Sequence, residues 1–239
     1  MNDATAQHTA VLADEPLAPL GQTERLAQAG AYAEALQVLD RALPRHAGDA
    51  RVHAARGWMI ENIEPVRLDE ARAAYETAIS LDPQEPWAGL GLATVLGRLG
   101  DTARSEALHR ELVERTRPQA ADAPELLELL GWCLYRLGRL DEAAEVFGRA
   151  LAVDGDWVSV RFDLGLVWLQ RGEAEAAAAE FRHALQALDG RPAQARAAAL
   201  RLALEDLDDA SLRHSKPAAL PATTALRAQL ADALAHCHD

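Results

Sequence analysis

The strongest constraint on the fold is a helical pattern that the chain carries twice, thirty-four residues apart. Gly138–Leu151 reads GRLDEAAEVFGRAL and Gly172–Leu185 reads GEAEAAAAEFRHAL, with Gly, Ala, Phe, Ala and Leu at matching positions. Upstream, Leu129–Gly138 (LLGWCLYRLG) aligns with Asp163–Gly172 (DLGLVWLQRG). A fixed period of this length is typical of helical repeats, in which one hairpin cannot bury its apolar face without a neighbour. We therefore expect each unit to be two helices joined by a glycine-containing turn.

The pattern extends over most of the chain in about five units. The second unit carries the matching motif ARAAYETAISLDP, whereas the third is the least regular, because Ser105 and His109 replace an alanine and an aromatic residue. A four-residue insertion, AADA, separates the third unit from the fourth. The expected units are residues 16–49, 50–85, 86–119, 124–157 and 158–191.

The flanking segments differ from the repeats in composition. We expect residues 1–15 to be mobile and residues 192–212 to form a helix that caps the last open face. Residues 213–221 contain the helix-breaking sequence RHSKPAALP and are expected to be a linker. Residues 222–239 have an amphipathic pattern, so they form a further helix that either caps the repeats or contacts a partner.

Composition favours an all-α protein and limits its partners. Hydrophobic residues make up 49% of the chain but aromatic residues only 5%, so the apolar content is mainly Ala and Leu, which favour helices. The net charge of −13 argues against binding to nucleic acid or to anionic membranes. Two cysteines, no secretory signal and no long apolar stretch lead us to expect a cytoplasmic protein without membrane insertion.

The residues at corresponding positions of the two clearest units resemble the tetratricopeptide repeat family, whose pattern is W-x2-L-G-x2-Y, A-x3-F, A and P. In the fourth unit the matching residues are Leu127, Leu130, Gly131, Leu134, Ala143, Phe147 and Ala150. In the fifth unit they are Arg161, Leu164, Gly165, Trp168, Ala177, Phe181 and Ala184. The resemblance implies a right-handed superhelical solenoid whose concave groove is lined by the first helix of each unit.

The resemblance also implies which residues line that groove, because family members use the same positions of each first helix. Three of the five tryptophans of this chain fall at such positions. The expected groove residues are Arg51, Trp58, Glu61, Asn62, Trp87, Leu90, Thr94, Arg98, Glu125, Glu128, Trp132, Tyr135, Arg136, Phe162, Asp163 and Leu166. Trp, Tyr and Arg dominate the energetics of protein interfaces, so a partner with apolar side chains is expected.

No sequence motif predicts a catalytic centre, a cofactor site or a metal site. The segment GLGLAT (89–94) has Gly-x-Gly spacing but lies in an expected helix, without the strand that a nucleotide site needs. The terminal HCHD (236–239) is rich in metal-binding side chains, but adjacent residues of a helix point in different directions. Cys133 lies inside an expected helix and is interpreted as a small core residue.

The leading functional hypothesis is a non-enzymatic adaptor that binds a peptide segment or a helix of another protein in the groove. Acidic Glu61, Glu128 and Asp163 would then pair with basic ligand residues, and Arg98 and Arg136 with acidic ones. One alternative is a chaperone for a client of an export or assembly system. Another is a structural scaffold that self-assembles as a homo-oligomer through its terminal helices.

Overall fold

The described part of the chain is entirely helical. The computed structural model describes residues 18–63, 67–121, 123–213 and 220–237, and within these ranges it contains no strand. The expected all-α fold is therefore confirmed. The expected mobile segment 1–15 and most of the expected linker 213–221 lie outside the described residues. Contacts divide the chain into two compact units, Asp3–Leu137 (unit 1) and Gly138–Asp239 (unit 2).

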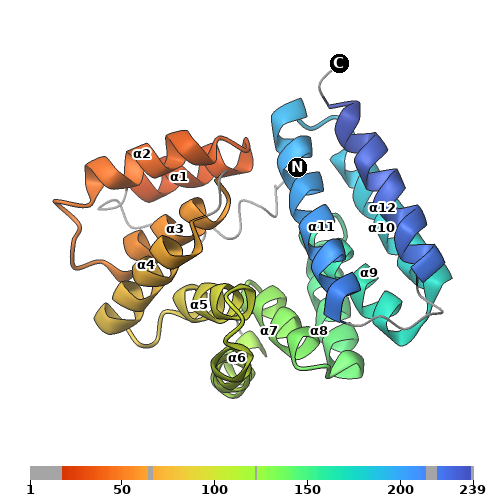
Figure 1. Cartoon of the computed structure of the whole chain (residues 1–239), viewed down its shortest axis with the longest axis horizontal. Coiled ribbons are helices and arrows are strands. Elements are labelled where there is room, and N and C mark those ends of the chain that lie inside the picture. The colour runs from red at the N-terminus through yellow and green to blue at the C-terminus, as the bar shows by residue number, and fades with distance from the viewer. Residues whose placement is uncertain (1–17, 64–66, 122, 214–219, 238–239) are drawn as a thin grey trace. The chain divides into compact units, whose positions relative to one another are not determined.

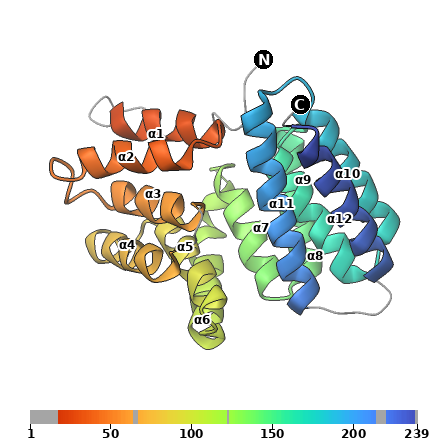
Figure 2. The same cartoon turned by 45° about the horizontal axis from the view of Figure 1, so that its top comes forward.

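Unit 1 consists of three helical hairpins followed by a single helix. Each hairpin packs on the next, since α2 contacts α3, α4 contacts α5 and α6 contacts α7. Figure 1 and Figure 2 show these hairpins following one another in chain order. The elements are α1 (Ala18–Gln28), α2 (Tyr32–Ala42), α3 (Ala50–Glu61), α4 (Leu68–Leu81), α5 (Pro86–Arg98), α6 (Thr102–Thr116), the short 3₁₀ helix η3 (Gln119–Ala121) and α7 (Leu126–Arg136).

Unit 2 contains two further hairpins and one preceding helix. Within it α8 packs on α9, α9 on α10 and α11 on α12. Its elements are α8 (Leu140–Val153), α9 (Val158–Arg171), α10 (Ala174–Leu188), α11 (Ala193–Arg213) and α12 (Leu220–Ala235). Each of the five expected repeats thus contains two helices, and the division between the units falls between the two helices of the fourth repeat.

A glycine in the left-handed conformation closes the turn of the α5–α6 hairpin and the turn of the α9–α10 hairpin. Gly100 has φ 88°, and the next amide, of Asp101, donates to the carbonyl of Leu96 at 2.9 Å. Gly172 has the same φ, and the amide of Glu173 donates to the carbonyl of Trp168 at 2.8 Å. These bonds satisfy the last carbonyls of each first helix, and residues with a Cβ rarely adopt that φ.

An aromatic residue on the second helix packs into a gap left by glycine on the first. A Cβ on Gly57 would lie 2.8 Å from the Tyr75 ring, and a Cβ on Gly91, in the following hairpin, 2.1 Å from it. In unit 2, a Cβ on Gly165 would lie 2.5 Å from the Phe181 ring. Glycine at these positions lets the helices approach closely enough to bury both rings.

Candidate functional site

The first helices of the unit 1 repeats form one continuous layer. Among them α1 contacts α3, α3 contacts α5 and α5 contacts α7. Thirteen of the sixteen expected groove residues lie on α3, α5 and α7 or directly next to an end of one of these helices. We call this surface the first-helix face, and its residues are Arg51, Trp58, Glu61, Asn62, Trp87, Leu90, Thr94, Arg98, Glu125, Glu128, Trp132, Tyr135 and Arg136.

Trp58 is the most exposed aromatic anchor of the first-helix face. It leaves 41% of its surface exposed, although it is among the largest apolar side chains of the chain. The ring of Tyr32, at the start of α2, meets it edge to face at 5.8 Å between centroids, with an interplanar angle of 84°. Asn62 donates from its side chain to the Trp58 carbonyl at 2.7 Å. The Tyr32 ring therefore packs against the indole on one side, while part of the indole surface stays open.

A second aromatic group lies on α7. The rings of Trp132 and Tyr135 are 5.3 Å apart between centroids, and the guanidinium of Arg136 lies 5.8 Å from the centre of the Trp132 ring. Arg136 also reaches α5, where a Cβ on Gly97 would lie 3.1 Å from its Nη2. Trp132 and Arg136 are partly exposed, but Tyr135 is buried. The expectation that Tyr135 offers a ligand-binding surface therefore does not match its position, because its ring packs beside Trp132.

Glu61 and Arg98 pair with each other. The Glu61 carboxylate, only 10% exposed, accepts a hydrogen bond from Arg98 Nη1 at 3.3 Å. It also accepts one from the Tyr75 hydroxyl at 3.1 Å. Burial of the ring, together with the charge of Glu61, raises the pKa of Tyr75 well above its ordinary value. The two groups were expected to meet charges on a ligand, but the structure uses them to join α3, α4 and α5.

Arg51 is also paired inside the chain. Its Nε and Nη2 donate to the two carboxylate oxygens of Asp49 at 3.2 and 3.1 Å. Asp49 caps α3 by accepting the backbone amide of Arg51 at 3.0 Å. Burial works against the charged form of Asp49, but the hydrogen bonds and charge of Arg51, with the charge of His46, lower its pKa overall. Arg51 and Asp49 are thus paired with each other inside the chain.

The remaining residues of the first-helix face lie between the two aromatic groups or at the start of α7. Trp87, Leu90 and Thr94 on α5 are partly buried and add apolar or weakly polar surface. Glu125 and Glu128, before and within the first turn of α7, are partly buried as well. None of these side chains converges on a reactive arrangement.

The three expected groove residues of unit 2 are buried. Phe162, Asp163 and Leu166 lie on α9, and the Phe162 ring meets that of Phe181 at 5.3 Å between centroids. The expectation that these three residues line an open surface is wrong for this structure. The physical reason is that α9 packs against α8, α10 and also α11.

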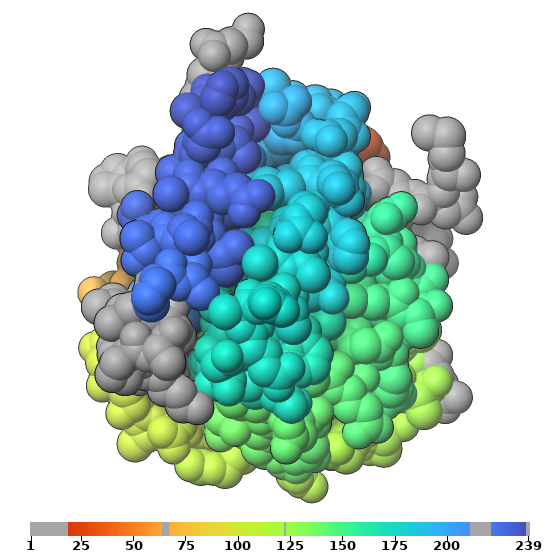
Figure 3. Space-filling view, turned by 90° about the vertical axis from the view of Figure 1, so that its right-hand side faces the viewer, coloured from red at the N-terminus to blue at the C-terminus, as the bar shows by residue number. Residues whose placement is uncertain are grey.

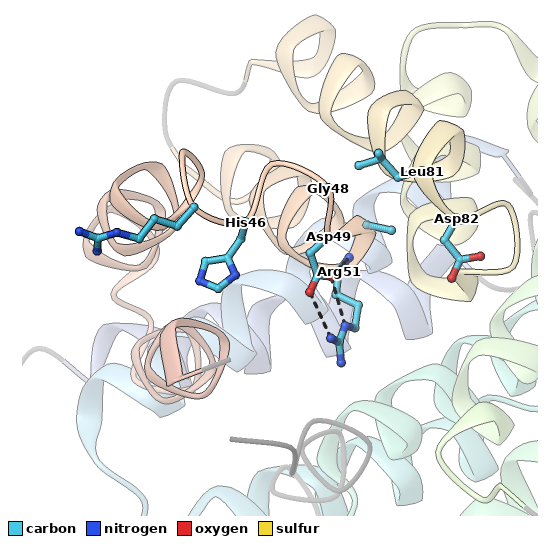
Figure 4. A pocket seen from close by; sticks show the side chains of 8 residues that line it. His46, Gly48, Asp49, Arg51, Leu81 and Asp82 are labelled. Carbon is cyan, nitrogen blue, oxygen red and sulfur yellow. Dashed lines mark hydrogen bonds and ion pairs between the residues drawn. The ribbon is translucent and has the colours of Figure 1, made fainter. Parts of the chain in front are cut away.

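A polar cavity that the sequence did not reveal lies between the α2–α3 loop and the end of α4 (Figure 4). It has a volume of about 480 Å³ and includes Arg51, which was expected in the groove. Figure 4 shows the Arg51 guanidinium turned onto Asp49. No local motif marks such a site, because its lining comes from a loop and two helix ends: Arg45, His46, Gly48, Asp49, Ala50, Arg51, Leu81 and Asp82.

Three further properties of the described residues bear on function: the reactivity of the Cys133 thiol, the clustering of metal-binding side chains, and the ability of helices to span a membrane. Burial raises the pKa of Cys133 to about 12, so its thiol is held in the unreactive form. Within the ranges that the structure describes, there is no cluster of three or more His, Cys, Asp or Glu arranged to hold a metal ion. None of the helices described is both long and apolar enough to span a bilayer.

Comparisons with known proteins identify the repeats. A family model described as tetratricopeptide repeat matches residues 90–156 and 143–192, and a second model of that description matches residues 67–85. Cellulose synthase operon protein C of Pseudomonas fluorescens is 31% identical over 157 residues, which is 62% of this chain but 12% of that protein. Tetratricopeptide repeat protein 1 of Schizosaccharomyces pombe is 34% identical over 137 residues, or 56% and 12% of the two chains.

The fold itself is similar to that of a solved assembly. In the crystal structure of the APC/C hetero-tetramer Cut9–Hcn1, the matching chain superposes with a TM-score of 0.55 at 17% identity. The match covers 98% of this chain and 52% of the other. At that identity the likeness concerns the helical-repeat architecture alone.

Proposed function

This chain belongs to the tetratricopeptide repeat family, whose members generally mediate protein–protein interactions, and from that premise we propose that unit 1 binds a segment of a partner protein on its first-helix face. The segment is an extended peptide or a helix with apolar side chains. Binding, and not catalysis, is the proposed role. The chain spans only 12% of the length of each matched relative. The proposed partner is therefore described by the chemistry that fits this face and not by the partners of those relatives.

The observation that carries the proposal is the exposed indole of Trp58. A large aromatic side chain that is held on one side by Tyr32 has already lost much of its freedom, so burying its open surface costs little entropy. Such preorganised aromatic anchors are typical of interface hot spots. Trp132, which contacts the Tyr135 ring and the Arg136 guanidinium, offers a second anchor of the same kind.

The charge arrangement supports an apolar ligand over a charged one. Glu61 is paired with Arg98, and Arg51 with Asp49. A ligand that used these charges would have to break an existing pair, which offsets the gain from the new one. We therefore propose that apolar contacts provide most of the affinity, with polar contacts at the rim.

The test is a peptide selection on the native chain followed by two tryptophan substitutions. Peptides selected from a displayed random library should be rich in apolar residues. Trp58→Ala should weaken their binding at least about 30-fold, because truncating a hot-spot aromatic costs about 2 kcal/mol or more. Trp132→Ala should have a similar effect, measured by fluorescence anisotropy.

A matched control distinguishes binding at the first-helix face from non-specific binding to exposed apolar side chains. Val153 on α8 is an apolar side chain that is 52% exposed, and it lies outside the first-helix face. Val153→Ala should leave the same peptides bound within about twofold. If both tryptophan variants keep native affinity while circular dichroism shows intact helices, the face is not the binding site.

The two alternative functions remain hypotheses with distinct readouts. A client chaperone requires a protein that becomes insoluble when it is produced without this chain. A self-assembling scaffold requires a mass that rises with concentration in light scattering. The tryptophan variants affect the first of these outcomes and leave the second unchanged.

A further inference from the structure

In unit 2 the helix that corresponds to α3, α5 and α7 is mostly buried. Ten of the fourteen residues of α9 are buried, including Asp163, Leu166 and Gln170, which lie on one stripe of the helix. Gly165 lies elsewhere on α9 and faces the Phe181 ring of α10. Because Gly165 already faces α10, the stripe of Asp163, Leu166 and Gln170 is buried against an element other than α10.

The C-terminal hairpin also packs on α9. α11 packs against α9, while α12 packs against both α11 and α10. Figure 3 shows α12 lying along α10 on the surface of unit 2. In the regular stacking of this chain, an incoming helix packs chiefly on the second helix of the preceding hairpin, as α5 does on α4. α11 instead contacts the first helix of its neighbour.

The chain reverses direction between α10 and α11 to reach this position. Gly190 has φ 81°, and Pro192 directly precedes α11. A left-handed glycine ends a helix sharply, and proline begins the next one without needing an amide partner. Regular repeats of the family carry proline near this point of the period; here Asp189 occupies its place.

We propose that α11 is a ligand in cis: it occupies the groove-side face of α9 as a partner helix would. A partner helix in trans then reaches α9 only by displacing the α11–α12 hairpin. The apolar stripe of α11, with Leu200, Ala203 and Leu207 buried, defines the ligand chemistry as an amphipathic helix with small and aliphatic residues. This inference rests on the proposed function, because it assumes that the first-helix side of a repeat is a binding surface. Its test measures the exposure of α9 directly.

Within the hairpin, α12 is the less buried helix. α12 buries Leu226 and Leu230 but leaves most of its other described residues exposed or partly exposed. Arg227 forms a bidentate ion pair with Asp208 of α11, with Nε 2.7 Å from Oδ1 and Nη2 3.1 Å from Oδ2. The two side chains are 55% and 46% exposed. Elements with few buried contacts open at a lower free energy than the rest of a fold.

The experiment is hydrogen exchange of the full chain, read in the peptides that cover 158–171. Leu207→Asp places a charge at a fully buried position of α11 and should raise α9 exchange at least about 10-fold. Arg227→Glu, a surface change, should raise it about 3-fold. The charge-swapped pair Asp208→Arg with Arg227→Asp should return exchange to within about twofold of the native rate.

The second readout is binding of a synthetic peptide of residues 193–213. The Leu207→Asp chain should bind this peptide at least about 10-fold more tightly than the native chain, whose own α11 competes with it. Two results overturn the inference: α9 exchange that stays at the native rate while α11 exchange rises, or equal peptide binding by both chains. Peptides selected on the native chain serve as the reference, because failure of the proposed function abolishes their dependence on Trp58 and leaves α9 exchange unaffected.

Discussion

Replacing Gly91 by Ala is expected to lower the free energy of unfolding by about 3 kcal/mol. The new Cβ would lie 2.1 Å from Tyr75 Cζ and 2.6 Å from its hydroxyl oxygen. The ring has no free side to move toward, because it is buried and also packs on Gly57. Any shift of the ring also pulls its hydroxyl from Glu61. Chemical denaturation followed by circular dichroism measures the change.

Gly148→Ala is the matched control, because it makes the same substitution inside a helix where space is available. No atom lies within 4 Å of a Cβ built on Gly148 of α8. Alanine is the better helix former, so this variant should gain about 0.5–1 kcal/mol. The opposite signs distinguish packing from propensity. A Gly91→Ala chain as stable as the native one would show that Tyr75 does not occupy the gap.

Cys133 in the folded chain should react with iodoacetamide about 1000-fold more slowly than in the unfolded chain at pH 8. Burial raises its pKa from 9.0 to about 12, so the reactive thiolate is about 1000 times rarer than for an ordinary thiol. Exclusion of the reagent from the core slows the reaction further. Mass spectrometry of the peptide that contains Cys133 gives the rate.

The reference for this measurement is the same chain in guanidinium chloride. The raised pKa also makes the contribution of Cys133 to stability fall as the pH rises from 9 toward 12, because the unfolded chain releases the thiol proton first. Labelling of Cys133 at the unfolded rate under native conditions would place it at an accessible site. Since Cys237 is a second free thiol, the rate must be assigned to each peptide separately.

The repeat architecture could be predicted from the sequence because its determinants are local. The period fixes where Gly100 and Gly172 close their turns and where Tyr75 and Phe181 pack. The course of α11 could not be predicted in the same way. Its helical pattern is visible in the sequence, but its packing on α9 depends on contacts outside the repeat period.

The candidate site was predicted less completely than the fold. The template positions lead to Trp58 on the first-helix face, where the structure leaves it partly exposed, and its role in binding stays a prediction. The same positions also lead to Phe162, Asp163 and Leu166, which are buried. The template assumes an open face, and only the tertiary packing of α11 reveals that this one is covered.

The pairing of charged side chains could not be predicted from the sequence either. Glu61 and Arg98 lie thirty-seven residues apart in the chain, and each looks like a free groove charge when read within its own repeat. Only the close packing of α3 on α5 brings the two side chains together. Pairs between repeats depend on rotamers, which no periodic pattern specifies.

Tyr75 gives two neighbouring hairpins a common centre. Its ring meets Gly57 in its own repeat and Gly91 in the next. In a linear array, the strength of each junction decides whether adjacent repeats melt singly or jointly. The helices α3 to α6 should therefore melt as one cooperative block, so that heat damage to either hairpin removes both halves of the surface around Trp58 and Leu90 at once.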